Sequence, residues 1–101
     1  MIGRLMTMTA QPGRGGELAG LLLRVTENLR GFPGCELYVI AQDAKDPDTV
    51  RVIEAWQDEE SAQRALASDS GNGPKPAEVI ALLAGPPERA DLDLLGGVGV
   101  G

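Results

Sequence analysis

The sequence predicts an α+β domain: a ferredoxin-like split βαβ sandwich with an antiparallel sheet and the element order β-α-β-β-α-α-β. Three observations lead to this fold class. β-prone segments alternate with segments whose apolar residues have helical spacing, turn residues separate the two kinds, and a chain of 101 residues suits one domain. We therefore expect a single domain over residues 1–95, followed by a glycine-rich C-terminal tail over residues 96–101.

The first half of the chain is predicted to form a strand, a helix and a second strand. Residues 2–10 are β-prone with a loose alternation, and the turn residues of 11–16 end this strand. Apolar residues then recur at helical spacing, with polar residues on the opposite face: Leu18, Leu21, Leu22, Val25 and Leu29. Gly31 ends the helix, and residues 35–42 form the second strand.

The middle of the chain is predicted to form a hairpin followed by a helix. The turn-rich segment 43–48 links the second strand to a third over residues 49–57, so the two strands are expected to pair in antiparallel fashion. Asp58 is well placed to cap a second helix, because the acidic residues after it suit the positive end of the helix dipole. This helix is expected to run to about Ala67.

The last third of the chain carries the weakest signals. Residues 68–76 are expected to be flexible, residues 77–84 to form a short third helix, and residues 89–95 to form the last strand. The tail resembles a phosphate-binding loop in composition only, because such a loop must open a helix. We interpret it as a flexible tail or an edge that reaches over a partner.

Both faces of the predicted sheet carry apolar side chains. On the second strand Leu37 and Val39 point to the face opposite Tyr38 and Ile40, because strand side chains alternate. The predicted helices can cover one face only, so the other needs a partner. A second copy of the chain is the simplest one, and we expect a homodimer.

The composition argues against several kinds of partner. A net charge of −6 repels polyanions, so nucleic acid is not an expected partner. No apolar stretch has the length of a membrane span, and we expect a protein without a membrane partner. The single Cys35 has no internal disulfide partner and suits a reducing compartment, which predicts a cytoplasmic location.

The chain has no histidine, and this absence limits the chemistry. It removes the usual base at neutral pH and the commonest zinc and haem ligand. The aspartates of segment 43–48 have the wrong spacing for a calcium loop and are interpreted as an acidic turn. We therefore predict no metal site.

Glu54 and Trp56 stand out on the third strand, because they share one face of it and Trp56 is the only tryptophan. Two interpretations are open. Glu54 either forms an ion pair with an arginine, for instance Arg4 or Arg51, beside an indole that fills the core, or it is a polar group in a pocket that the indole lines. The residues alone favour the first interpretation.

The segment 54–62 (EAWQDEESA) resembles the signature of the antibiotic biosynthesis monooxygenase family of dimeric α+β barrel proteins. Family members share a Glu-x-Trp strand end, an acidic helix start and an alanine a few residues later. Further stretches agree in order and spacing over most of residues 1–68: Pro12-Gly13, Pro33-Gly34-Cys35 and Asp46-Pro47-Asp48-Thr49. Together these matches are fairly specific.

The resemblance implies a homodimer of ferredoxin-like subunits whose sheets pack into a dimeric α/β barrel. Characterised relatives include cofactor-free oxygenases of polycyclic phenols and anthrones, quinol monooxygenases and haem-degrading enzymes. In the oxygenases the substrate supplies the electrons, so dioxygen is the co-substrate and no cofactor is implied. An indole suits such a pocket by stacking on a flat substrate and by donating its N–H.

The sequence also departs from the family. Many members carry a histidine nine residues after the tryptophan, where this chain has Ala65, and some use an asparagine on the first strand, where the nearest equivalent is Met6. Only Trp56 carries over from the known catalytic set, and haem degradation by the His-ligated route is not expected. Four residues are candidates for a base or a donor, with the choice left open: Tyr38, Glu54, Arg4 and Arg51.

We therefore predict a cofactor-independent monooxygenase that oxidises a small phenolic, anthrone or quinol substrate with dioxygen. Trp56 is the predicted catalytic residue, and the predicted substrate-binding residues are Trp56, Glu54, Tyr38, Met6 and Arg4. The alternative is a non-catalytic homodimeric module of the same fold that binds a small ligand. The missing histidine and asparagine favour the alternative, and the retained Glu-x-Trp favours the enzyme.

Overall fold

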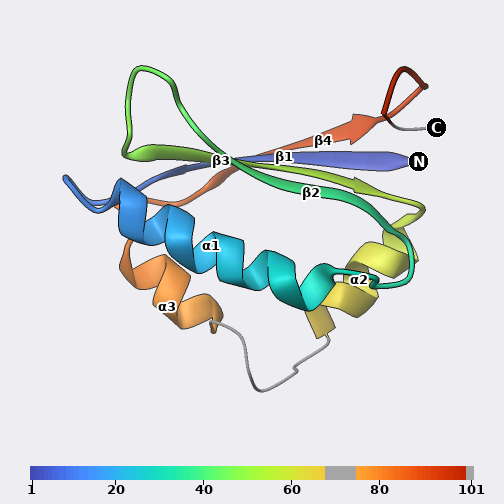
Figure 1. Cartoon of the computed structure of the whole chain (residues 1–101), viewed down its shortest axis with the longest axis horizontal. Helices are drawn as coiled ribbons and strands as arrows, with labels where there is room; N and C mark the ends of the chain where they lie inside the picture. The colour runs from blue at the N-terminus through green and yellow to red at the C-terminus, as the bar shows by residue number, and fades with distance from the viewer. Residues whose placement is uncertain (68–74, 100–101) are drawn as a thin grey trace.

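The computed structural model describes residues 1–67 and 75–99, and it confirms the predicted fold class and element order. A four-stranded antiparallel sheet is covered on one face by helices (Figure 1). The elements, in chain order, are β1 (Ile2–Thr9), α1 (Gly15–Leu29), β2 (Cys35–Gln42), β3 (Thr49–Trp56), α2 (Glu59–Ala67), α3 (Pro76–Ala81) and β4 (Glu88–Asp93). The predicted flexible segment 68–76 falls mostly outside the described residues, as does the end of the tail.

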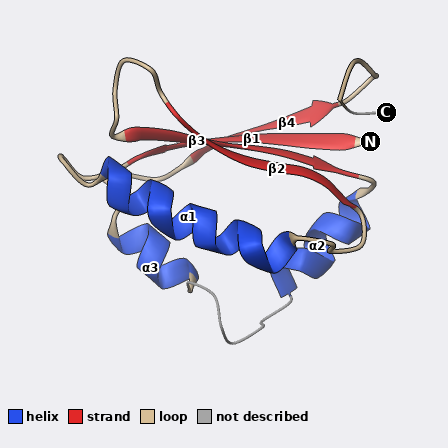
Figure 2. Cartoon of the chain, viewed as in Figure 1, coloured by secondary structure: helices blue, strands red, loops and turns tan. Residues whose placement is uncertain are grey.

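The strands lie in the order β2-β3-β1-β4, and every neighbouring pair is antiparallel. The predicted hairpin of β2 and β3 is therefore present, with a register shift between Cys35 and Leu37 at its start. Figure 2 shows all helices on the same side of the strands. Side chains at alternate strand positions consequently either face the helices or point away from them.

The third helix is shorter than predicted, and the reason lies in the strand next to it. Residues 82–84 were expected to be helical, but Leu83 forms an isolated bridge with Ala10, and the Ala84 N–H donates to the carbonyl of Thr9 at 2.8 Å. Pairing with the end of β1 thus competes with the last turn of α3 and ends the helix at Ala81. The last strand is displaced to Glu88–Asp93 from the predicted 89–95.

The core lies between α1 and the sheet. Leu18 and Leu22 of α1 are 0% and 4% exposed, and Val50 and Val52 of β3 are 0% and 1% exposed. These side chains form one cluster together with Ala10 and Leu82. The chain has only three aromatic side chains, so this cluster is made of aliphatic residues.

The acidic turn between β2 and β3 anchors the start of α1. The carboxylate of Asp48 accepts hydrogen bonds from the N–H groups of Gly13 and Gly15, each at 3.0 Å. Asp43 and Asp46 accept hydrogen bonds from N–H groups of their own loop. The interpretation of these aspartates as an acidic turn is confirmed, because their oxygens serve the backbone of the turn and the helix start.

The face of the sheet opposite the helices is apolar, as the alternation predicted. Val39 and Ile53 are directly paired across β2 and β3 and are 41% and 40% exposed. Leu92 of β4 is 46% exposed on the same face. No helix covers this face in the described part of the chain (Figure 1). Nor is any described helix long and apolar enough to cross a membrane.

Gly34 combines a positive φ with a close approach to another element, so we expect its replacement to be harmful. Its φ is +87°, and an added Cβ would overlap the side chain of Ser61 at the start of α2. We predict that Gly34→Ala lowers the free energy of unfolding, measured in urea, by about 2 kcal/mol or more, from backbone strain and overlap together.

Gly20 provides the matched control, because it is exposed within α1 and has open space around it. Gly20→Ala is expected to raise the free energy of unfolding by about 0.5 to 1 kcal/mol through helix propensity. Equal effects of the two substitutions would contradict the close approach of Gly34 to α2.

Candidate functional site

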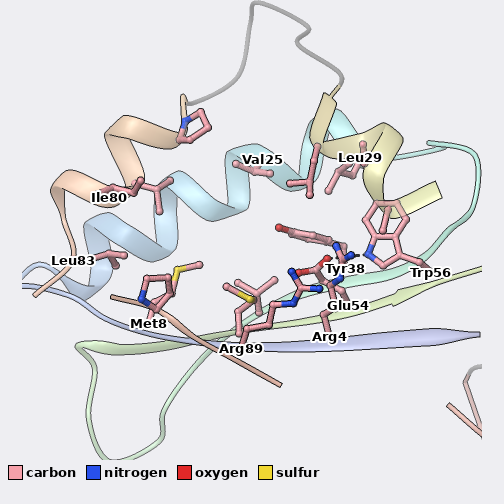
Figure 3. Close-up of a pocket in the computed structure, with 18 residues that line it drawn as sticks. Arg4, Met8, Val25, Leu29, Tyr38, Glu54, Trp56, Ile80, Leu83 and Arg89 are labelled. Atoms are coloured by element: carbon pink, nitrogen blue, oxygen red, sulfur yellow. Dashed lines mark hydrogen bonds between the residues drawn. The ribbon is translucent and has the colours of Figure 1, made fainter. Parts of the chain in front are cut away.

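A cavity of about 350 Å³ lies between the sheet and the helices (Figure 3). Most of its wall is apolar, with side chains from β1, β3, α1, α2 and α3 and from the residues after α3: Met6, Met8, Val25, Leu29, Val52, Ala62, Ala65, Leu66, Val79, Ile80 and Leu83. Leu66 of α2 and Ile80 of α3 line the cavity and are also 77% and 65% exposed. The cavity therefore reaches the surface beside these two helices.

The polar residues of the cavity form a row across the sheet. Arg4 of β1, Glu54 of β3 and Tyr38 of β2 are direct neighbours in the strand register, so all three face the same side. Figure 3 shows them gathered with Trp56 at one end of the cavity, whereas Met8 lies toward the other end. The cavity thus has a polar end and an apolar end.

Trp56 is both a core residue and part of the cavity wall. Its side chain is 2% exposed, and it meets Phe32 edge to face, with 6.3 Å between the ring centroids and 83° between the planes. The indole Nε1–H donates a hydrogen bond to Oε1 of Glu54 at 2.9 Å. The indole N–H that the family resemblance assigned to the substrate is therefore taken by Glu54, because both side chains lie on one face of β3.

Glu54 is partly buried, and its pKa is raised above the usual value. Burial raises it most, while the hydrogen bond from Trp56 and the positive charges of Arg4 and Arg89 act in the opposite direction. Burial also raises the pKa of the Tyr38 hydroxyl, and the charge of Glu54 adds to this effect. Tyr38 is consequently a protonated donor at neutral pH, and Glu54 holds a proton more strongly than an exposed glutamate does.

Of the two interpretations of Glu54, the ion pair with Arg4 or Arg51 is wrong. Arg4 is 6% exposed, and its Nη2 donates to Oε1 of Glu59 at 2.6 Å, so its ion pair is made with α2. Arg51 pairs with Asp43 at 2.7 Å and does not line the cavity, because it occupies the alternate face of β3. The Nε of Arg4 is buried without a hydrogen-bond partner among the described residues.

Asp58 fixes the start of α2 beside this site. Its Oδ1 accepts the N–H of Ser61 at 2.8 Å, as expected for a helix cap. Hydrogen bonding from Ser61 and the positive charge of Arg64 lower the pKa of Asp58. The cap sets where Glu59 begins the helix, and thereby where Arg4 finds its partner.

All five residues predicted to bind the substrate line the cavity: Trp56, Glu54, Tyr38, Met6 and Arg4. Ala65, at the position of the family histidine, lines it as well. Arg89 of β4 was not predicted, because it follows two prolines in a segment without a motif, yet it lies near Glu54. Val25 and Leu29 were not predicted either, since their place on the apolar face of α1 indicated burial and gave no sign of a cavity.

No cluster of three or more His, Cys, Asp or Glu side chains that could hold a metal ion occurs among the residues the structure describes. The side chains at the polar end of the cavity supply a carboxylate, a phenol, an indole and two guanidinium groups.

Comparisons with known proteins identify the family of the chain and find solved structures with the same fold. The family model of antibiotic biosynthesis monooxygenases matches residues 1–70. A crystal structure of a candidate antibiotic biosynthesis monooxygenase from Chloroflexus aurantiacus is 31% identical, covers 99% of this chain and 98% of its own, and has a TM-score of 0.79. No match was found among curated proteins.

Two further crystal structures are similar at lower identity, where the likeness concerns the fold. One is a candidate antibiotic biosynthesis monooxygenase from Caulobacter crescentus, with 21% identity, coverage of 94% and 90%, and a TM-score of 0.81. The other is a mutant form of SnoaB, a cofactor-independent oxygenase from Streptomyces nogalater, with 18% identity, coverage of 96% and 95%, and a TM-score of 0.78.

The raised pKa of Glu54 predicts a pH-dependent effect on stability. In the folded chain the carboxyl holds its proton to a higher pH than in the unfolded chain, so its contribution to stability is lost as the pH rises above the usual glutamate pKa. We expect the free energy of unfolding of Glu54→Gln, relative to the wild type, to increase from pH 4 to pH 7. Denaturant unfolding across this range measures it, and a constant or falling difference would contradict the desolvation of Glu54.

Proposed function

The chain belongs to the antibiotic biosynthesis monooxygenase family, and from this premise we propose that it oxidises a small phenolic, anthrone or quinol substrate with dioxygen and without a bound cofactor. The proposal is carried by one observation: the Glu54–Trp56 hydrogen bond stands at the polar end of an otherwise apolar cavity that opens to the surface. A flat aromatic with an oxygen at one end matches both ends of such a cavity.

The reaction needs no outside reductant. When an anthrone CH₂ group becomes a carbonyl, one atom of dioxygen enters the product and the other leaves as water with the two hydrogens. The substrate supplies all four electrons. The protein then has to bind the aromatic, favour its deprotonated and electron-rich form, and keep water from the oxygen adduct.

The cavity residues suit these tasks. The apolar wall from α1, α2 and α3 excludes water and contacts the ring system of the substrate. The indole of Trp56 offers a flat surface, held in place by Phe32 on one side and by the hydrogen bond to Glu54 on the other. Glu54, Tyr38 and Arg4 supply the charge and the hydrogen bonds at the end where the oxygen of the substrate would lie.

The alternative is a non-catalytic module that binds a small ligand in the same cavity. It is supported by Ala65 and Met6, because both line the cavity where family members carry histidine or asparagine. Binding without oxygen consumption would favour it over the enzyme.

We further propose that the protein is a cytoplasmic homodimer in which the open faces of two sheets pack together. Val39, Ile53 and Leu92 are each at least 40% exposed on that face, which is more apolar surface than a solvated sheet face usually carries. A symmetric contact between two copies covers both open faces at once. The free Cys35 suits the reducing cytoplasm.

The oxidation is tested by dioxygen consumption with a panel of anthrones, hydroquinones and naphthols. We expect at least one substrate to be turned over, and Trp56→Phe to lower kcat/KM by about tenfold or more, because the Glu54 carboxylate loses a hydrogen bond. Leu23→Ala is the control, since Leu23 is 54% exposed on α1 and does not line the cavity, and it should retain most of the rate. Equal rates for wild type and Trp56→Phe would remove the indole from the mechanism.

The dimer is tested by light scattering at micromolar concentration. We expect the wild type to have twice the mass of one chain and Ile53→Glu to have the mass of one chain, because a buried unpaired carboxylate at the interface is costly. Leu23→Glu is the matched control, because Leu23 is 54% exposed on α1, in the helix layer. A monomeric wild type, or dissociation of both variants, would contradict the proposed interface.

A further inference from the structure

Glu54 and Tyr38 are paired across β3 and β2 at the polar end of the cavity, and the proposed function does not say which group accepts the proton of the substrate. Resting on that function, we propose that Glu54 is the base that accepts the phenolic proton of the substrate and that Tyr38 donates a hydrogen bond to the oxyanion that forms. The pair would make neutral phenols the substrate class and disfavour aryl carboxylates.

Glu54 has one oxygen available for this task. Oε1 accepts the indole N–H of Trp56 at 2.9 Å, and no hydrogen bond to Oε2 is formed within the described part of the chain. The hydrogen bond from Trp56 fixes the orientation of the carboxylate, because Trp56 is itself held in the core. A carboxylate that lines the cavity and is fixed through one of its oxygens is suited to act as a general base.

Two arginines near Glu54 favour its ionised form, but neither forms an ion pair with it. Arg4 and Arg89 favour the carboxylate, but each of these arginines is engaged by another acid, Arg4 by Glu59 at 2.6 Å and Arg89 by Asp91 at 2.7 Å. Burial works against the carboxylate and makes it a stronger base than an exposed one. Once ionised, Glu54 is therefore a stronger proton acceptor than an exposed glutamate.

Tyr38 suits the complementary role. Burial and the charge of Glu54 both raise the pKa of its hydroxyl, so the hydroxyl stays protonated at neutral pH. It makes no hydrogen bond to any of the described residues, although its side chain is partly buried and lines the cavity. The hydroxyl is therefore available to donate, and a substrate oxygen in the cavity would accept its hydrogen bond.

The step is a simple proton transfer. The phenol O–H bond breaks, the proton bonds to Oε2 of Glu54, and the electron pair stays on the oxygen of the substrate. Glu54 becomes a neutral carboxylic acid, and the Tyr38 hydroxyl donates to the new phenolate. The transfer moves the proton within the complex, so the net charge of the complex stays the same. Before and after the step, the substrate oxygen and Glu54 hold one proton between them.

This shared proton gives the test. We use 4-nitrophenol, whose own pKa lies near neutrality, and measure binding through the fluorescence of Trp56, the only tryptophan. In the wild type the apparent Kd should rise about tenfold per pH unit above the pKa of the probe, because a bound phenolate would face the Glu54 carboxylate. In Glu54→Gln this rise should disappear, since the neutral amide does not repel the phenolate.

Two more variants complete the design. Tyr38→Phe should weaken binding of the probe about tenfold, because the oxygen loses its donor. Glu36→Gln is the matched control for charge, since Glu36 is an exposed residue of the same strand as Tyr38 and does not line the cavity; it should behave like the wild type. Circular dichroism of each variant checks that it is folded.

The outcomes separate this inference from the proposed function. The roles of Glu54 and Tyr38 are overturned if the probe does not bind, if Glu54→Gln keeps the pH dependence of the wild type, or if Tyr38→Phe binds the probe unchanged. The proposed oxidation fails if no substrate consumes dioxygen, even when the binding pattern holds. With turnover, the low kcat of Glu54→Gln should recover at a pH above the pKa of the substrate, where solvent has already removed the proton.

Discussion

A carboxylate in an apolar cavity is the constraint on which the rest of the site depends. Glu54 is costly to bury, and the fold compensates with the indole N–H of Trp56 at 2.9 Å and with the nearby charges of Arg4 and Arg89. Arg4 is in turn held by Glu59 at the first position of α2. Glu54 is therefore held by the indole of its own strand, and it lies near a positive charge that the helix after the strand keeps in place.

The dependence of the site on α2 explains why local features outside the cavity matter for it. The Asp58 cap sets the first turn of α2, and Gly34 allows the loop before β2 to approach Ser61 in that turn. The N–H of Gln57 donates to the carbonyl of Gly34 at 2.8 Å, which ties the same loop to the end of β3. The end of β3 that carries Trp56 is thus fixed from both sides, and so is the polar end of the cavity.

Much of this was predictable from the sequence because its periodicities are local. Alternation along β3 places Glu54 and Trp56 on one face, and helical spacing along α1 identifies its buried side. The partners of the charged groups were not predictable, because Arg4 and Glu59 are 55 residues apart and their meeting depends on where α2 starts. The end of α3 was missed for a similar reason, since a bridge to Ala10 overrides the local helical preference.

The proposal that a flat phenol occupies the cavity beside Trp56 is the central claim, and nuclear magnetic resonance tests it most directly. The chain has one tryptophan, so its ¹H–¹⁵N spectrum contains one indole N–H signal, that of the hydrogen bond to Glu54. Titration with 1-naphthol should move this signal in a saturable way with one ligand per chain, together with the amides of Tyr38 and Val79. A saturable shift confined to the open face of the sheet, with the indole signal unmoved, would contradict the account.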